Sequence, residues 1–286
     1  MKISKIAMIG GGTMGSQIAM QTAISGYDTT LYSRSEGTVN KAKDFSDGWF
    51  AKRVEKGKMS KEDADAAQQR LHFTTDLKTA VENVDLVIEA VADVLDIKKK
   101  VLSEIDSMTP DHTIFASNSS YIVSSRFADA VADPSKVLNL HFFNPVLVMK
   151  LVEVVKGPHV SDETIEVMIE FVKSINKEPA IVNKEIYGFI VNRIFSAITK
   201  EACYMYDQDV ASYEDIDKAV KYGLSHPMGP FELLDMTGID LEYDVLSEKY
   251  KMTGDVADKP SPTIVEHYAK GEYGKKSGKG FYEYSK

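Results

Sequence analysis

A glycine-rich turn near the start of the chain constrains its fold more than any other stretch. The apolar residues 6–9 lead into Gly10-x-Gly12-x-x-Gly15, and residues 16–25 then follow a helical pattern. In a dinucleotide-binding turn, Gly10 permits the tight bend, Gly12 lets the backbone approach a pyrophosphate, and Gly15 lets the helix pack on the sheet. The free N–H groups of that helix favour an anion. An ordinary strand-to-helix turn is the alternative. The predicted cofactor-binding turn comprises Gly10, Gly12, Thr13, Met14 and Gly15.

Length, charge and cysteine content set broad limits on the protein. The 286 residues suffice for one large domain or two ordinary ones. A formal net charge of -9, with no basic arm, argues against nucleic acid as a partner. The single cysteine, Cys203, excludes an internal disulfide and fits a reducing compartment. The chain enters a strand without a signal peptide and has no membrane-spanning apolar run, so we expect a cytoplasmic protein with no membrane partner.

Strand-like and helix-like stretches alternate up to about residue 182. The stretch 85–91 is almost continuously apolar, as expected of a strand that is buried on both faces of a parallel sheet. The alternation predicts an α/β fold with a doubly wound sheet of the Rossmann type. Further strands are predicted at 27–32, 113–117, 137–143, 151–155 and 180–182, and helices at 37–57, 59–70, 94–107, 122–132 and 161–176.

The pattern changes near Lys184, where strands nearly disappear. Residues 186–208 are predicted to form one long helix, with further helices at 215–222, 231–250 and 261–270. We therefore expect a dinucleotide-binding domain over residues 1–184 and a smaller all-helical domain over residues 185–286. A small helical domain with an exposed apolar face often buries that face in a homodimer, which is the association we predict. This face is formed by Ile190, Ile194, Ala197 and Ile198.

A histidine and a glutamate lie near the ends of two predicted strands. His141 precedes Glu153 by twelve residues, and Asn144-Pro145 starts the turn between them. A carboxylate that is bonded to one imidazole nitrogen fixes the tautomer, so the other nitrogen is free to take a proton. A hydride-transfer enzyme needs such a base to deprotonate a substrate hydroxyl. The spacing leaves open the alternative that the two side chains never meet.

A serine-rich sequence, Ser117-Asn118-Ser119-Ser120, closes the strand at 113–117. It lies at the edge of the sheet where ligands bind in open α/β folds. Hydroxyls at this edge can donate to a developing alkoxide or bind a nicotinamide ribose. The commoner use of such serines is to cap the following helix.

Several blocks together resemble the 3-hydroxyacyl-CoA dehydrogenases, especially the bacterial 3-hydroxybutyryl-CoA dehydrogenases. The blocks are the glycine turn and residues 116–120, 141–154, 188–193 and 226–233, and the similarity continues to residues 276–282. The resemblance implies reversible oxidation of an (S)-3-hydroxyacyl-CoA to the 3-ketoacyl-CoA, with hydride transfer to a nicotinamide cofactor. It also implies that His141 is the catalytic base, that Glu153 orients it, and that Ser120 and Asn192 hold the reacting oxygen.

The resemblance further implies which residues bind the cofactor and the substrate. Asp93 stands where the family usually has glutamate, which is a longer acid of the same charge. Lys52 and Lys56 belong to a basic cluster, and Lys56 matches a lysine that contacts coenzyme A, whose phosphates such a cluster suits. A solvated helix end is the alternative for this cluster. The residues expected at the cofactor site are Asp93, Lys98, Ser120 and Asn144.

The end of the second strand departs from the family pattern. Ser33 occupies the position of an aspartate that binds the adenosine ribose in NAD enzymes of this type. Its loss removes a charge-assisted hydrogen bond worth on the order of 1.5–3 kcal/mol toward NAD. It also removes the repulsion against a 2′-phosphate, which Arg34 can bind between Ser33 and Ser35. This strand end predicts NADP, whereas the family resemblance predicts NAD. The alternative is that Arg34 points into solvent and NAD still binds.

Two smaller departures flank the predicted site. Tyr187 precedes Gly188 where the family commonly has proline, and we expect it to loosen the domain junction. Tyr121 follows Ser120 where the family has a second serine, and we expect it to narrow the site.

Two other functions are compatible with this architecture. A dehydrogenase of free 3-hydroxy acids uses a catalytic lysine, so the His141–Glu153 pair argues against it. A nonenzymatic dinucleotide-binding relative, of the lens-crystallin kind, does not need Ser120, His141, Glu153 and Asn192 together. No metal site is predicted because the other histidines lack partners at ligand spacing. These are His72, His112, His159, His226 and His267.

Overall fold

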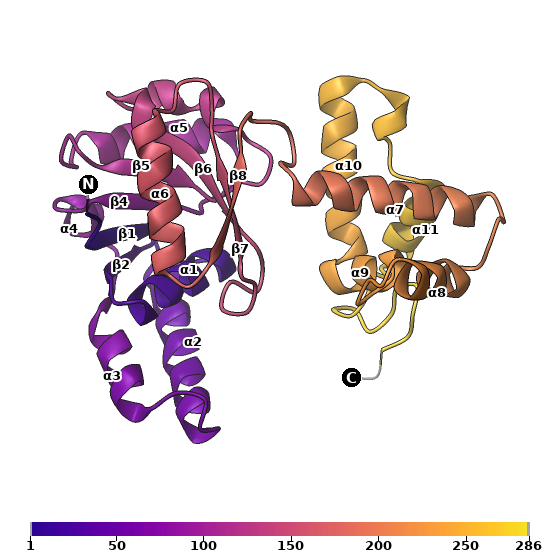
Figure 1. Cartoon of the computed structure of the whole chain (residues 1–286), viewed down its shortest axis with the longest axis horizontal. Coiled ribbons are helices and arrows are strands. Elements are labelled where there is room, and N and C mark those ends of the chain that lie inside the picture. The colour runs from indigo at the N-terminus through magenta and orange to yellow at the C-terminus, as the bar shows by residue number, and fades with distance from the viewer. Residues whose placement is uncertain (1, 285–286) are drawn as a thin grey trace. The chain divides into compact units, whose positions relative to one another are not determined.

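The computed structural model describes residues 2–284, which form two compact units (Figure 1). The first unit ends at Ile190 and the second begins at Val191, so the division lies beyond the predicted position at Lys184. The reason is that the residues after the last strand still pack on the first unit. Phe189 is buried in a small apolar cluster with Val155 and Val182.

One eight-stranded sheet forms the centre of the first unit, which confirms the predicted doubly wound α/β fold. The strand order is β3-β2-β1-β4-β5-β6-β7-β8, and every neighbouring pair is parallel except β6 and β7. The order reverses beside β1, which is where such sheets bind ligands. The strands are β1 (Lys5–Ile9), β2 (Asp28–Tyr32), β3 (Leu71–Thr74), β4 (Leu86–Glu89), β5 (Ile114–Ser117), β6 (Val137–Phe142), β7 (Leu151–Val155) and β8 (Glu178–Val182).

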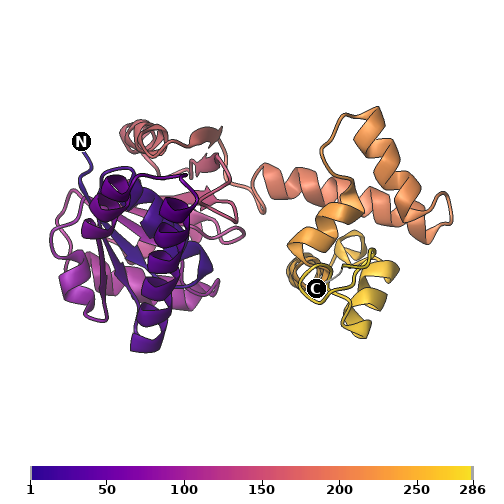
Figure 2. The ribbon, with the colours of Figure 1, turned by 90° about the horizontal axis from the view of Figure 1, so that it is seen from below.

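Successive residues of the central strands contribute to two hydrophobic layers. Ile6 and Met8 of β1 join the layer beneath α1, α2, α3 and α6, whereas Ala7 and Ile9 join the layer beneath α4 and α5. Helices therefore flank both faces of the sheet (Figure 2). They are α1 (Thr13–Ile24), α2 (Glu36–Glu55), α3 (Lys61–Gln69), α4 (Leu77–Val81), α5 (Leu95–Asp106) and α6 (Asp162–Ser174).

The second unit is helical, as predicted. The buried carboxylate of Asp235 binds the segment of residues 281–284. Asp235 accepts hydrogen bonds from the backbone N–H groups of Phe281 and Tyr282 and from the hydroxyl of Tyr284. Gly280 leaves room for this carboxylate, because a Cβ there would lie 2.0 Å from Asp235 Oδ1. The helices are α7 (Val191–Asp207), α8 (Tyr213–Gly223), α9 (Pro230–Thr237), α10 (Ile239–Thr253) and α11 (Pro262–Lys270).

The helix predicted at 122–132 is wrong. Residues 122–132 contain only short 3₁₀ turns at Ser124–Arg126 and Ala128–Ala130. Backbone N–H groups within the stretch close only short 3₁₀ turns, and side chains from distant segments bind other backbone groups of the stretch. Asn139 donates to the carbonyl of Ile122, and Asp106 accepts from the N–H of Ala132.

Two other predicted helices differ from the structure in extent. The helix expected from residue 186 begins at Val191, because Gly188 (φ 75°) and Phe189 (φ 47°) adopt left-handed backbone conformations that an α-helix excludes. The helix expected at 231–250 is divided into α9 and α10 at Gly238, where φ is 110°. The sequence prediction also missed β3 and α4, which are four and five residues long.

Candidate active site

The glycine turn has the geometry that a dinucleotide requires. Gly10 has φ 111°, and a Cβ there would lie 2.6 Å from the carbonyl oxygen of Ala90. A Cβ at Gly15 would lie 1.8 Å from the carbonyl oxygen of Gly10, so α1 packs against the turn as predicted. Nothing lies within 4 Å of a Cβ at Gly12, which starts α1 without a side-chain cap. The first N–H groups of α1, beginning at Thr13, therefore fit a pyrophosphate.

The end of β2 lies beside this turn. The Cβ of Ser33 is 3.4 Å from the position that a Cβ would take at Gly11. The Ser33 N–H donates to the carbonyl of Thr74 at 3.2 Å, which fixes the strand end. Arg34 is exposed, and Glu36, also exposed, begins α2 two residues later. A serine hydroxyl and an exposed guanidinium thus follow β2 beside the glycine turn.

His141 and Glu153 meet directly. They lie opposite each other in the antiparallel register of β6 and β7, and His141 Nδ1 is 2.7 Å from Glu153 Oε2. The other nitrogen, Nε2, is 2.9 Å from the Ser120 hydroxyl. Both members of the pair are buried, with exposed fractions of 4% for His141 and 0% for Glu153. Because the carboxylate accepts from Nδ1–H, the lone pair on Nε2 is available to a proton from the side of Ser120.

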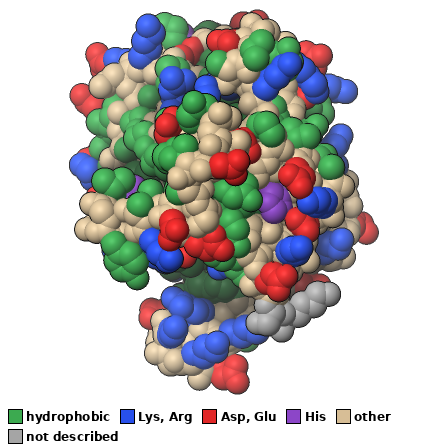
Figure 3. Space-filling view, turned by 90° about the vertical axis from the view of Figure 1, so that its right-hand side faces the viewer, with side chains coloured by type: hydrophobic (Ala, Val, Ile, Leu, Met, Phe, Trp, Pro, Cys, Tyr) green, Lys and Arg blue, Asp and Glu red, His purple; other side chains and the backbone are tan. Residues whose placement is uncertain are grey.

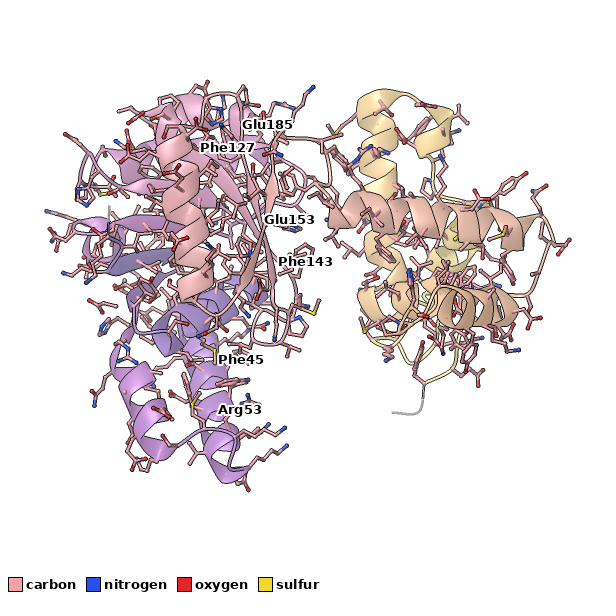
Figure 4. All side chains as sticks on the ribbon, viewed as in Figure 1. Phe45, Arg53, Phe127, Phe143, Glu153 and Glu185 are labelled. Carbon is pink, nitrogen blue, oxygen red and sulfur yellow. The ribbon has the colours of Figure 1, made fainter. Side chains whose placement is uncertain are left out.

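Aromatic rings surround the imidazole. The ring of Phe143 lies 4.6 Å from that of His141 between centroids, and the ring of Phe189 lies 5.4 Å away. Figure 4 labels Phe143 and Glu153 on this side of the sheet. Apolar rings keep water away from the His141–Glu153 bond, and the lower local dielectric strengthens it.

A second polar network occupies the end of β4. Lys98 of α5 is almost fully buried, and its ammonium lies 3.0 and 3.1 Å from the two oxygens of Glu89 and 3.2 Å from Asp93. Ser117 donates to Glu89 at 2.8 Å, and Ser119 donates to Asp93 at 2.5 Å. Lys98 was expected to contact the cofactor, but its charge is enclosed by two carboxylates. Its effect on the site therefore passes through Asp93 and Ser119.

Glu89 is a site residue that the sequence interpretation did not select. It accepts hydrogen bonds from Lys98, from Ser117 and from the N–H of Val91. The sequence feature that could have identified it is its position among the apolar residues 86–91, where it is the one acidic residue. A buried acid in such a run needs a cationic partner, which the sequence alone did not identify.

The remaining predicted residues lie on other segments, each within its own unit. Asn144 is exposed and accepts from Gln17 of α1 at 3.4 Å, which places it beside the first helix. Lys52 and Lys56 are exposed at the C-terminal end of α2, on the helix where Figure 4 labels Phe45 and Arg53. Asn192 lies in the first turn of α7, in the second unit.

The described residues also bear on metal binding, membrane insertion and thiol chemistry. Residues 2–284 contain no group of three or more His, Cys, Asp or Glu that could hold a metal ion. Within the same range, no helix is long and apolar enough to cross a membrane. Cys203 is buried in the helical unit, and this burial raises the pKa of its thiol to about 12. A thiol in that state is packed rather than reactive.

Models of one family match almost the whole chain. The NAD binding domain of 3-hydroxyacyl-CoA dehydrogenase matches residues 5–186, and the C-terminal domain of the same family matches residues 188–284. The 3-hydroxybutyryl-CoA dehydrogenase of Clostridioides difficile is 38% identical, over 99% of this chain and 100% of that protein. The human mitochondrial hydroxyacyl-coenzyme A dehydrogenase is 36% identical, over 99% of this chain and 91% of that protein.

Solved structures show the same similarity. The (S)-3-hydroxybutyryl-CoA dehydrogenase of Ralstonia eutropha has a TM-score of 0.92 and 34% identity, with 100% of both chains covered. A diketoreductase, described as a catalyst for dicarbonyl compounds, has a TM-score of 0.90 and 30% identity, with 99% of this chain and 100% of that chain covered.

Proposed function

The chain belongs to the 3-hydroxyacyl-CoA dehydrogenase family of NAD-dependent oxidoreductases, and we propose that it interconverts (S)-3-hydroxybutyryl-CoA and acetoacetyl-CoA. The observation that carries this proposal is the hydrogen-bonded series Ser120–His141–Glu153. A bound nicotinamide would take up the hydride from the alcohol carbon or return it to the ketone. The residues of this chain handle the proton and the charge on the oxygen.

His141 acts as the general base in oxidation and as the general acid in reduction. Nε2 takes the hydroxyl proton, and Glu153 stabilises the resulting imidazolium through Nδ1–H. In the reverse direction the imidazolium returns this proton to the carbonyl oxygen. The Ser120 hydroxyl lies 2.9 Å from Nε2, so it is close enough to donate a hydrogen bond to an oxygen that reacts at Nε2. We assign a second such hydrogen bond to Asn192 of the helical unit.

Reduction of acetoacetyl-CoA, followed by nicotinamide absorbance, tests the proposal. Free acetoacetate and a simple diketone serve as control substrates, because a structurally similar diketoreductase acts on dicarbonyl compounds. We expect turnover that requires the CoA thioester. If only the control substrates were turned over, the proposed class of substrate, an acyl-CoA thioester, would be wrong. Binding of the cofactor without turnover of any of these compounds would favour a nonenzymatic dinucleotide-binding protein.

The cofactor preference is a finer proposal. We propose that Ser33 and Arg34 allow NADP to bind in addition to NAD, the cofactor of the family. The support is that Ser33 lies against the glycine turn and brings no carboxylate there, while Arg34 is exposed beside it. The nearby Glu36 opposes a 2′-phosphate, so the gain from Arg34 has to exceed this repulsion. Parallel assays with NADH and NADPH measure the outcome.

Lys52 and Lys56 are proposed to contact the phosphates of coenzyme A. Both are exposed near the C-terminal end of α2, where they also complement the helix dipole. Replacement of both by alanine is expected to raise KM for acetoacetyl-CoA. The control is acetoacetyl-pantetheine, which lacks the nucleotide phosphates, and its KM should not change. An equal change for both substrates would contradict a phosphate contact.

A homodimer through the helical unit is the last part of the proposal. Ile194, Ala197 and Ile198 of α7 line an apolar groove together with Ile216 and Val220 of α8. Ile194 is 57% exposed, although isoleucine is usually buried. A second copy of the chain would cover this surface.

A further inference from the structure

The segment of residues 185–190, the junction segment, joins β8 to α7 and contacts the site at several points. We propose that it is a positioning element for Ser120, His141 and Glu153. This inference rests on the proposed function for its catalytic consequence, but its contacts stand independently of the reaction. The pairs in contact are Glu185 with Ser124 and Ser125, Tyr187 with Tyr121, Phe189 with His141, and Ile190 with Glu153.

Phe189 holds the imidazole from the junction side. Its side chain is 1% exposed and lies 5.4 Å from the His141 ring between centroids. Its backbone has φ 47°, which is uncommon for a residue with a bulky side chain, and it directly follows Gly188 at φ 75°. The two left-handed residues reverse the chain, so that the Phe189 ring enters the cluster of Val155 and Val182. This turn explains why α7 begins only at Val191.

Ile190 fixes the second oxygen of the catalytic carboxylate. Its N–H donates to Glu153 Oε1 at 2.9 Å, while Oε2 lies 2.7 Å from His141 Nδ1. Because each oxygen accepts a hydrogen bond, the carboxylate cannot rotate without breaking a buried hydrogen bond, which is costly. The junction segment therefore sets the plane of the group that orients His141.

Tyr187 and Glu185 fix the loop that carries Ser120. The rings of Tyr121 and Tyr187 lie 4.7 Å apart between centroids at 34°. Because Tyr121 directly follows Ser120, this ring contact links the junction segment to the loop that carries Ser120. Glu185, labelled in Figure 4, accepts from Ser124 Oγ at 3.3 Å and from the Ser125 N–H at 3.2 Å, farther along the same loop.

A double-mutant cycle tests whether Tyr121 and Tyr187 act on the reaction as a pair. Tyr121→Ala, Tyr187→Ala and the double variant are compared in kcat for acetoacetyl-CoA reduction. Each single change should lower kcat by about 2- to 10-fold, the usual worth of an aromatic pair. The kcat of the double variant should be no lower than that of the less active single variant. Tyr187→Phe keeps the ring and should lose less of the rate than Tyr187→Ala. Multiplicative losses, or no loss, would overturn the pairing.

The imidazole spectrum of His141 tests the junction segment without relying on turnover. ¹⁵N NMR of the labelled protein, with His141→Gln to assign the signal among six histidines, reports which ring nitrogen carries the proton. We expect the wild type to show the Nδ1–H tautomer. Ile190→Pro removes the N–H that donates to Glu153, and Phe189→Leu removes the ring beside His141. In both variants the spectrum should show a mixture of the Nδ1–H and Nε2–H tautomers. Residue 190 directly precedes Val191, the first residue of α7, so the proline does not interrupt the helix.

Ile186→Ala is the matched control, because this residue belongs to the same segment and its side chain is exposed. It should leave the spectrum unchanged. An unaltered His141 signal in both Phe189→Leu and Ile190→Pro would overturn the positioning role. If the wild type fails to reduce acetoacetyl-CoA, the proposed function is wrong, but the spectra still decide whether the junction segment orients His141.

Discussion

At the scale of single residues, the chemistry of His141 depends on two hydrogen bonds, one to Glu153 at 2.7 Å and one to Ser120 at 2.9 Å. His141→Ala removes the proton acceptor and should lower kcat for acetoacetyl-CoA reduction by at least ~10²-fold, the usual worth of a general base. Glu153→Gln preserves the shape but not the charge, so a smaller loss is expected. Circular dichroism checks the fold of both variants. An unimpaired His141→Ala enzyme would exclude this mechanism.

The strand end at Ser33 and Arg34 determines a second residue-scale prediction. Arg34→Gln should reduce kcat/KM for NADPH and leave that for NADH unchanged, because only NADPH carries the 2′-phosphate. Ser33→Asp should restore the ribose-binding carboxylate and improve the ratio of NADH to NADPH use by about 10-fold or more, consistent with a hydrogen bond to a charged group. Equal effects of Arg34→Gln on both cofactors would mean that Arg34 does not contact the phosphate.

Cys203 illustrates how burial controls reactivity. Its thiol has a pKa raised to about 12, chiefly because burial disfavours the thiolate. Since the thiolate is the nucleophile, iodoacetamide should modify the native protein very slowly between pH 7 and 9. Unfolding in urea should accelerate the reaction strongly. Mass spectrometry measures the alkylation. Rapid alkylation of the folded protein would show that the helical unit opens readily.

At the scale of elements, the ion pairs between β4 and α5 anchor the loop that carries Ser120. Lys98→Met leaves Glu89 buried without its cation and should reduce the free energy of unfolding by about 3–5 kcal/mol. Urea denaturation measures this loss. The matched control is Lys99→Met, since Lys99 pairs with Asp129 at the surface and should change stability by less than about 1 kcal/mol. Similar losses in both variants would contradict the buried pair.

Glu89→Gln combined with Lys98→Met extends this test. Removing both charges avoids the isolated buried carboxylate, so the double variant should be more stable than Lys98→Met alone. The activity of the double variant should be lower than that of the wild type, because Asp93 and Ser119 lose their connection to Lys98. Recovery of stability together with full activity would show that this network supports only the fold.

At the scale of the whole molecule, the apolar groove on α7 and α8 predicts self-association. Hydrophobic side chains reach the surface between charged ones on the face shown in Figure 3. Light scattering should give twice the chain mass of 31.8 kDa. Ile194→Glu should shift the protein toward one chain, because it places a charge in the groove. Val265→Glu on α11 is the control, since Val265 is exposed outside the groove. A wild-type mass of one chain would refute the dimer.

Local features of the sequence were sufficient for much of the fold. The apolar residues 6–9 and the glycines of the turn specify a strand, a tight bend and a closely packed helix within a few residues. Ser60 caps α3, where its hydroxyl accepts from the N–H of Asp63, three residues along the chain. Such signals depend on periodicity and backbone conformation, which neighbouring residues determine.

Predictions failed where distant segments compete for backbone groups. The stretch 122–132 contains residues that a helix tolerates, but Asn139 and Asp106 bond its backbone from elsewhere. The long helix expected from residue 186 failed because Phe189 gains burial only by leaving helical geometry. Neither competition is visible in local sequence, since both depend on side chains that folding brings together.

The sequence by itself determined the doubly wound fold, the family, and the types of residue from which a hydride-transfer site is made. The tertiary structure decided which of these residues meet. A spacing of twelve residues between His141 and Glu153 is compatible with contact or separation, and the antiparallel register of β6 and β7 selects contact. The tertiary structure also decided that Lys98 is enclosed by Glu89 and Asp93, and that the Ile190 N–H donates to Glu153. Periodicity is local, whereas register and buried pairing arise only when distant segments share one interior.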